Sequence, residues 1–233
     1  MKTRKKTEYG NEELVQDSLD VLANKETGVD EYRDAFEKLG KKLGEILAKK
    51  FEDIPAEETM LVCSSEDADW LTKGVQSGFN KGVLPISVYW STRKTIYESR
   101  DGYKVEISPI VMAYEEPINS CSLLVIVKSI ISSSCVVKTQ LLRLVNRVCP
   151  ERIVIMAPVV YKDGIPNLKK EFPESISKKF RFITFAEDSE RIGGEVIPGV
   201  GGLVYERLGL GNVHTKNQYI PMFVKSRVDS EEF

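Results

Sequence analysis

The chain has 233 residues, of which 42% are hydrophobic and 29% are charged, and its formal net charge is −2. This composition is ordinary for a soluble globular protein, and the balanced charge gives no general basic footprint for nucleic acid. No apolar run approaches the ~20 residues of a membrane span, and residues 1–9 lack the apolar core of a signal peptide. Residues 1–6 are most simply a solvated tail.

The first part of the chain is predicted to be helical. A short helix is expected over residues 12–22, and a longer amphipathic helix follows from Tyr32 to Phe51, where apolar residues recur at three- and four-residue steps. Asp30 is the expected N-cap, and Ile54-Pro55 ends this segment. The sequence therefore predicts a helical N-terminal arm over residues 1–55.

From residue 56 the pattern changes to strands that alternate with helices. Extended segments are expected at 59–63, 84–90, 105–114, 123–127, 152–157 and 181–185, and helices at 68–80 and 137–148. Residues 91–103 are predicted to form a polar excursion or a long hairpin. This order predicts an α/β domain over residues 56–211, with a mostly parallel sheet flanked by helices, and then a C-terminal tail, 212–233.

Cysteine and histidine usage narrows the chemistry. The four cysteines lack paired CxxC spacing, and we expect buried, reduced thiols in a cytoplasmic protein. His214 is the only histidine, which leaves little for a histidine-based zinc site or a Ser-His-Asp triad. Chemistry would therefore rest on carboxylates, lysines, arginines, hydroxyls and backbone groups.

Three loops are expected beyond the carboxyl ends of the strands, where open parallel sheets bind ligands. The first carries Ser64, Ser65, Glu66, Asp67 and Asp69. Its acids either bind a metal or a ribose or only stabilise a helix N-terminus. The second loop offers Lys128, Ser129, Ser132, Ser133 and Ser134 where a helix begins. These residues suit a phosphate monoester, and the alternative is that the serines simply cap the helix.

The third loop, residues 193–202, contains five glycines and one proline. Such a run makes a poor helix and a poor strand, but it exposes backbone N–H and C=O groups that a planar nucleobase needs. The alternative is an ordinary glycine-rich surface loop.

The order of these pieces resembles the uracil phosphoribosyltransferase family, of the type I phosphoribosyltransferase fold, over residues 22–55 and 104–211. Leu123–Leu142 is similar to that family's phosphoribosyl-pyrophosphate motif, and Phe185–Arg191 resembles its acidic segment before the hood that binds the base. The run Val196-Ile197-Pro198-Gly199-Val200-Gly201 is similar to the hood itself, and Glu206-Arg207-Leu208 is close to its Asp-Arg-Leu ending.

This resemblance implies a reaction in which a nucleobase displaces pyrophosphate from phosphoribosyl pyrophosphate with the help of Mg²⁺. The residues of the second loop, Lys128, Ser129, Ser132, Ser133 and Ser134, remain the candidates for phosphate binding. The hood candidates are Glu195, Val196, Ile197, Gly199, Gly201 and Gly202, and the candidates for the pyrophosphate and metal region are Ser64, Ser65, Glu66, Asp67, Asp69 and Arg93. Homo-oligomers are implied by the resemblance alone.

Several positions depart from the family pattern. Lys128 stands where the family has an acidic residue, and Ser133-Ser134-Cys135 replaces a Thr-Gly-Gly type of loop. Glu195 replaces an aromatic residue, and Gly202 replaces an aspartate. An ammonium at position 128 removes an acceptor for the ribose hydroxyls, and the acids of the first loop would repel pyrophosphate unless Mg²⁺ intervened.

The sequence thus predicts a protein that binds a nucleotide or a ribose 5-phosphate group as a binding or regulatory subunit, with standard phosphoribosyl transfer lost or redirected. The alternative is an active, Mg²⁺-dependent phosphoribosyltransferase or nucleotide-processing enzyme that forms a nucleoside monophosphate.

Two segments are candidate contacts for partners. Arg93-Lys94, with Tyr89, Trp90 and Tyr97, would contact a protein or single-stranded nucleic acid, or would form a solvated hairpin with aromatic residues packed underneath. The apolar run 219–224 would dock on this chain or on a neighbouring one.

Overall fold

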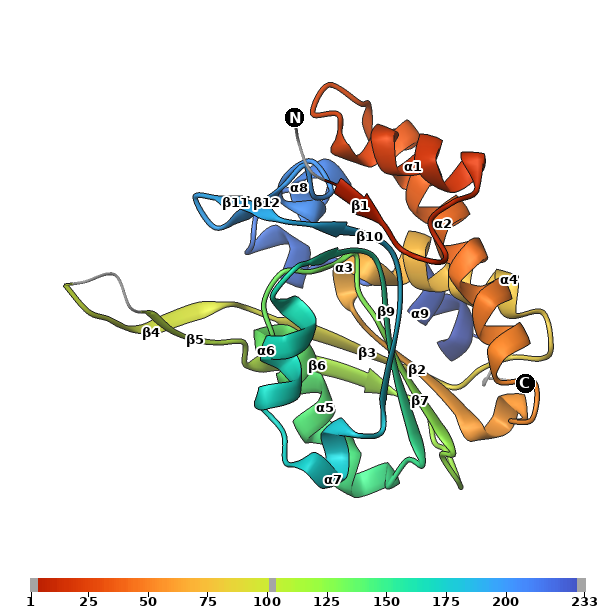
Figure 1. Ribbon diagram of the computed structural model, residues 1–233. Coiled ribbons are helices and arrows are strands. Elements are labelled where there is room, and N and C mark those ends of the chain that lie inside the picture. The colour runs from red at the N-terminus through yellow and green to blue at the C-terminus, as the bar shows by residue number, and fades with distance from the viewer. Residues whose placement is uncertain (1–3, 101–103, 230–233) are drawn as a thin grey trace.

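Five parallel strands form the centre of one large sheet in the computed structural model, which describes residues 4–100 and 104–229. The strand order is β1-β10-β9-β7-β2-β3-β6, with the edge strands β1 and β6 antiparallel to their neighbours and the short β8 paired with β9 (Figure 1). These strands are β1 (Arg4–Lys6), β2 (Thr59–Ser64), β3 (Ile86–Ser91), β6 (Ile110–Glu115), β7 (Leu123–Val127), β8 (Ile130–Ile131), β9 (Arg152–Tyr161) and β10 (Phe180–Asp188). The expected fold class is confirmed.

The sheet is buried on both faces, which explains why its central strands are continuously apolar. Every residue of β7 is buried: Leu123, Val125 and Val127 pack into one core, and Leu124 and Ile126 pack into the other. Successive side chains of a strand point to opposite faces, so one apolar run supplies both cores.

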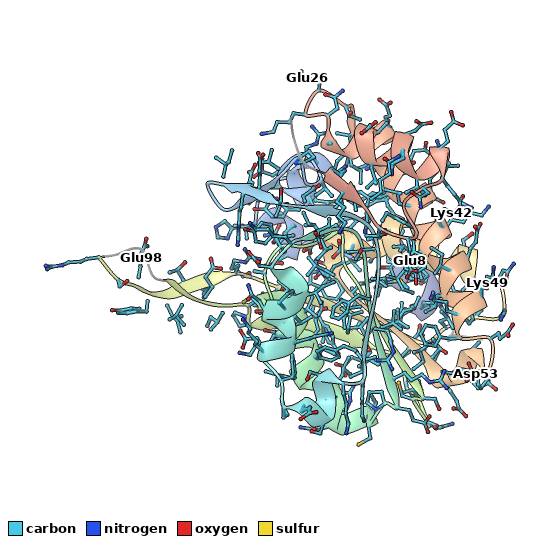
Figure 2. The ribbon with its side chains drawn as sticks, in the orientation of Figure 1. Glu8, Glu26, Lys42, Lys49, Asp53 and Glu98 are labelled. Atoms are coloured by element: carbon cyan, nitrogen blue, oxygen red, sulfur yellow. The ribbon has the colours of Figure 1, made fainter. Side chains whose placement is uncertain are left out.

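Helices cover each face. The first core is closed by α1 (Glu13–Ala23), α2 (Val29–Lys50) and α4 (Lys73–Phe79), and the second by α5 (Cys135–Val148), α6 (Gly164–Lys170) and α7 (Glu174–Ser177). α2 follows Gly28 as N-cap, so Asp30 lies in its first turn rather than at the cap. The outer face of α2 carries Lys42 and Lys49 (Figure 2).

The expected helix at 68–80 is divided. After the short α3 (Ser65–Asp67), a π-helical turn η2 (Ala68–Thr72) leads into α4. α2 and α4 approach closely at Gly44 and Gly78, where an added Cβ would collide with backbone atoms of the other helix. A 3-10 turn, η1 (Ala56–Glu58), precedes β2.

The polar segment after β3 is a hairpin. β4 (Lys94–Glu98) pairs with β5 (Lys104–Ile107) in an arm that projects from the body of the molecule (Figure 1). Tyr89 and Trp90 are buried in the core, whereas Tyr97 is exposed on the arm. Only Tyr97 of the three aromatic residues is therefore presented at the surface beside the basic side chains.

The N-terminus differs from the expected tail. Arg4–Lys6 pairs with β10, and the Arg4 guanidinium makes two hydrogen bonds, of 2.9 and 2.8 Å, to the buried Asp188 carboxylate. A run of basic residues has no apolar pattern, so hydropathy could not predict this strand. An ion pair holds it in place instead. Residues 1–3 of the predicted tail lie outside the described residues.

The C-terminal part packs on this chain. It contains the hairpin β11 (Glu190–Ile192) and β12 (Glu195–Ile197), then α8 (Val204–Arg207), the 3-10 turn η3 (Thr215–Asn217) and α9 (Met222–Val228). Phe223 and Val224 are buried in the first core. Of the two docking modes that we expected for residues 219–224, the structure therefore shows docking within the chain.

The burial of the cysteines and the character of the helices can be compared with what the sequence predicted. Cys63 and Cys121 are buried, Cys135 is half-buried and Cys149 is exposed, and all four are free thiols. Burial was therefore predicted correctly for two of them. Among the described residues, no helix combines the length and apolar character needed to cross a membrane.

Candidate functional site

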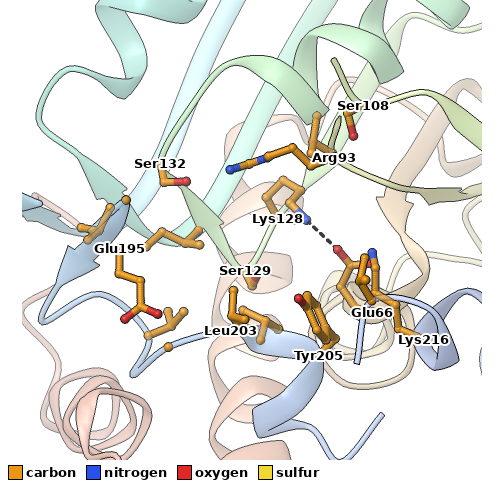
Figure 3. A pocket seen from close by; sticks show the side chains of 18 of the residues that line it. Glu66, Arg93, Ser108, Lys128, Ser129, Ser132, Glu195, Leu203, Tyr205 and Lys216 are labelled. Carbon is orange, nitrogen blue, oxygen red and sulfur yellow. Dashed lines mark hydrogen bonds and ion pairs between the residues drawn. The ribbon is translucent and has the colours of Figure 1, made fainter. Parts of the chain in front are cut away.

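A cavity of about 270 Å³ opens where β2, β3 and β7 end (Figure 3). Its walls come from the loops that follow these strands, from the β5–β6 connection, from the β11–β12 hairpin with the chain after it, and from η3. The sequence predicted ligand loops at the carboxyl ends of the strands, and this cavity joins all three of them.

Lys128, directly after β7, forms the floor of the cavity and is only 7% exposed. Its ammonium is ion-paired with the Asp67 carboxylate, lies 3.6 Å from Glu66 Oε1 and donates to Ser64 Oγ at 3.2 Å. Asp67 also accepts the backbone N–H of Ser129 at 3.1 Å. The lysine predicted to bind phosphate is therefore committed to a buried ion pair.

A second lysine completes this cluster. Lys216, from η3, places its ammonium 3.3 Å from Glu66 Oε2 and 5.4 Å from the centre of the Tyr205 ring. Burial alone would lower the pKa of Lys128, but Asp67 and Glu66 outweigh it and raise that pKa. Burial would likewise raise the pKa of Glu66, but Lys128 and Lys216 lower it. Two ammonium groups thus face two carboxylates.

The Mg²⁺ implied by the family resemblance does not fit this donor set. Mg²⁺ binds through carboxylate oxygens and waters. Here both Glu66 oxygens face an ammonium group, and Asp67 is enclosed by Lys128 and Ser129. A divalent cation bound to these oxygens would lie beside two positive charges.

The serine loop before α5 and the side chain of Arg93 together form a cationic corner of the cavity. Ser132 lines the cavity, and Ser133 Oγ accepts a hydrogen bond of 3.2 Å from the Arg93 guanidinium. Ser134 occupies the N-cap position of α5 without a capping side-chain hydrogen bond, and instead bonds to Glu171 at 3.2 Å. The alternative of serines that only cap the helix is therefore not what the structure shows for Ser134.

Arg93 supplies the charge of this corner. It comes from the base of the β4–β5 arm and has no carboxylate within ion-pair distance in the part of the chain that the structure describes. Its guanidinium and the N-terminal end of the 14-residue α5 are both electropositive.

Some of the predicted hood residues line the cavity, and the others contact the rest of the chain and support the loop. Glu195, Val196 and Gly202 line the cavity. Ile197, Gly199 and Gly201 are not among its lining residues.

The scaffold residues of the hood are held by the N-terminal arm and by the end of β10. Gly199 N–H donates to Asp188 at 2.8 Å, its carbonyl accepts from Arg4 at 2.6 Å, and the Tyr32 hydroxyl donates to the Val200 carbonyl at 2.7 Å. Gly201 has φ +74° and lies against the Leu22 carbonyl, so a side chain there would both strain the backbone and collide.

The acidic loop after β2 is similarly divided. Only Glu66 reaches the cavity, while Ser64 and Ser65 are fully buried below it. Asp69 points elsewhere: its carboxylate accepts the N–H groups of Met222 at 2.9 Å and Phe223 at 2.7 Å. Asp69 therefore fixes the start of α9.

Sequence reasoning missed four polar residues that line the cavity: Ser91, Ser108, Tyr205 and Lys216. Tyr205 directly precedes Glu206-Arg207-Leu208, the stretch that resembles the ending of the family's hood. That resemblance could therefore have drawn attention to Tyr205. The two serines and Lys216 carry no local pattern, because tertiary folding alone brings them to the strand ends.

The fold and cavity define an α/β protein with a ligand-sized site at the carboxyl edge of its parallel sheet. No protein-family model and no curated protein matches the chain. Among solved structures, the AQ2163 protein from Aquifex aeolicus is 14% identical, covers 85% of this chain and 95% of its own, and has a TM-score of 0.63. This likeness shows the fold.

Weaker matches include two proteins with known ligands or activity. Adenine phosphoribosyltransferase from Leishmania donovani is 13% identical over 78% of this chain and 86% of its own, with a TM-score of 0.43. A hypothetical protein from Neisseria gonorrhoeae with bound ppGpp is 16% identical over 64% and 80%, with a TM-score of 0.41. These scores are too low to carry a functional argument, and the uracil-specific resemblance stays a prediction.

Proposed function

We propose that the cavity binds a nucleotide or a ribose 5-phosphate group, and that the protein acts as a binding or regulatory subunit rather than in standard phosphoribosyl transfer. The observation that carries this proposal is the Arg93 corner beside the hood. Its cation lacks a carboxylate partner in the described chain, and it lies against the serine loop at the start of α5.

The phosphate is assigned to this corner. A guanidinium offers planar N–H donors that match two phosphate oxygens, and serine hydroxyls and helix N-terminal N–H groups add further donors. Ser132 and Arg93 both line the cavity and supply the first two kinds.

The base is assigned to the hood. Val196, Val200 and Leu203 give an apolar surface, and Gly194 and Gly202 expose backbone beside it. A flat, partly apolar group with polar edges suits such a wall, because planar rings pack on the side chains while their edges reach backbone groups.

The Lys128–Asp67 pair argues against standard transfer. The resemblance implies a carboxylate for the ribose hydroxyls at position 128 and a Mg²⁺-assisted pyrophosphate site nearby. In this protein position 128 is an ammonium, and the adjacent acids Glu66 and Asp67 are paired with lysines. Neither acid is therefore available to accept a hydrogen bond from a ribose hydroxyl or to coordinate the metal.

Calorimetric titration of uridine, cytidine, adenosine and guanosine monophosphates, each compared with its nucleoside, tests the binding. We expect Arg93→Ala to weaken the best nucleotide by about 10- to 100-fold, since a hydrogen-bonded charge pair is lost. Nucleoside binding should change little, and Lys94→Ala on the same arm is the matched control. Equal weakening of nucleotide and nucleoside would contradict the assignment of the phosphate.

A transfer assay tests the other half of the proposal. Purified protein with Mg²⁺, phosphoribosyl pyrophosphate and uracil is expected to yield essentially no uridine monophosphate. Robust product formation would overturn the loss of transfer and support the active phosphoribosyltransferase instead. Light scattering on the same preparation tests the homo-oligomer that the family resemblance implies.

A further inference from the structure

The base of the β4–β5 arm contains a buried hydroxyl group in the wall of the cavity. Ser108, between β5 and β6, is only 2% exposed, and its Oγ is buried without a hydrogen-bond partner among the described residues. Buried polar atoms in folded proteins are almost always hydrogen-bonded, so such an atom needs a reason. Ser91, at the end of β3, is also buried and lines the same wall.

Ser108 occupies a corner of its own. In Figure 3, Arg93 extends between Ser132 and Ser108, and Tyr205 lies at the opposite side of the cavity. The guanidinium of Arg93 points toward the start of α5, where it donates a 3.2 Å hydrogen bond to Ser133. With the phosphate at α5 and the base at the hood, the Ser91–Ser108 wall is left for the sugar.

The charges that line the cavity limit what this corner accepts. Lys128 and Lys216 are balanced by Glu66 and the underlying Asp67, and Glu195 lies 4.0 Å from Lys25. Arg93 is therefore the one lining cation in the described chain without a carboxylate partner. One such cation suits one phosphate group, and a second phosphate at the serine wall would be desolvated without a counter-charge.

Resting on the function proposed above, we propose that the cavity selects ribonucleoside monophosphates, with the Ser108 hydroxyl hydrogen-bonded to the ribose hydroxyls and Ser91 beside it. Rotation about one side-chain bond turns a serine hydroxyl among three staggered positions, which lets Ser108 reach the ligand without backbone movement. A hydroxyl both donates and accepts, as the ribose hydroxyls do. The sugar contact thus moves from the position of Lys128 to the wall that Ser91 and Ser108 line.

The test compares the best-binding ribonucleoside monophosphate with its analogue that lacks both sugar hydroxyls. We expect wild-type protein to prefer the ribonucleotide by about 3- to 10-fold, as for one or two neutral hydrogen bonds, and Ser108→Ala to reduce this ratio to near one. Ser18→Ala is the matched control, because Ser18 is a buried serine of α1 that bonds within its own helix. It should keep the full ratio.

The outcomes separate the two proposals. A full preference retained by Ser108→Ala, or equal binding of both ligands by the wild type, would overturn the sugar contact while nucleotide binding stands. Tighter binding of the triphosphate than of the monophosphate would overturn the charge argument. Failure of every ribonucleotide to bind the wild type would remove the proposed function as well. Ser91→Ala gives the same readout if Ser108→Ala does not fold.

Discussion

At the scale of single residues, the Lys128–Asp67 ion pair dominates the candidate site. Both side chains are buried, so removal of one partner leaves an uncompensated charge away from water. We expect Lys128→Met to lower the free energy of unfolding by about 3–5 kcal/mol. The double variant Lys128→Met/Asp67→Asn should recover most of this loss, because Asn keeps an acceptor for the Ser129 N–H.

Urea denaturation of both variants measures this effect. Lys94→Met on the exposed arm serves as the control and should stay within about 0.5 kcal/mol of wild type. Equal stability of Lys128→Met and the double variant would show that the charge of Asp67 is not what the lysine compensates.

The same pair shows where sequence reasoning stops. The apolar run before Lys128 was enough to place this residue at the carboxyl end of a buried strand. Its partner Asp67 lies 61 positions away, in a loop after a different strand. No local spacing links the two residues. The sequence pattern therefore assigns Lys128 to phosphate binding, whereas the folded chain places it in a buried ion pair.

At the scale of elements, the loop after β2 distributes its three acids among three tasks. Glu66 faces the cavity, Asp67 holds Lys128, and Asp69 accepts two N–H groups at the start of α9 and the Tyr219 hydroxyl. The π-helical turn η2 contains Asp69 and turns it away from Glu66. Sequence reasoning correctly located this acidic loop at the strand ends, but tertiary contacts decide which acid faces which way.

Asp69→Ala tests the role of this acid in attaching the C-terminal segment. We expect faster hydrogen–deuterium exchange at Met222 and Phe223 and a loss of stability of about 1–3 kcal/mol, because buried donors lose their acceptor. Exchange in β7 should increase by no more than the measured loss of global stability accounts for. The control Asp34→Ala removes an exposed acid of α2 that pairs with Lys38, and it should leave α9 protected. Unchanged exchange at α9 in Asp69→Ala would contradict this role.

The hood illustrates the same division between pattern and contact. A glycine-rich run at this place in an α/β order was enough to predict a ligand wall, and Val196 and Gly202 do line the cavity. The face that Gly199 and Gly201 present to the N-terminal arm was not predictable, because Arg4, Tyr32 and Leu22 lie more than a hundred residues earlier.

At the scale of the whole molecule, carboxylates paired with cations make stability depend on pH. Glu115 of β6 accepts from Arg143 at 2.6 Å and Arg147 at 2.5 Å, both on α5, and from the Tyr89 hydroxyl at 2.6 Å. Burial alone would raise its pKa, but these three partners lower the pKa of Glu115 to about 2. The same pairing lowers the pKa of Glu66 in the cavity.

A carboxyl whose pKa is lower in the folded than in the unfolded chain stabilises the fold when ionised. This contribution is complete above the unfolded pKa, which is 4.5 for a glutamate, and is lost as the pH falls toward the folded value. We therefore expect the free energy of unfolding, from urea titrations at a series of pH values, to fall steadily between about pH 5 and pH 2. Glu115→Gln should be less stable at pH 7 and should show a shallower fall, whereas Glu57→Gln, an exposed control, should follow the wild type. Parallel curves for wild type and Glu115→Gln would mean that the attachment of α5 to the sheet edge does not depend on the charge of Glu115. The acid sensitivity would then arise at Glu66 and the cavity instead.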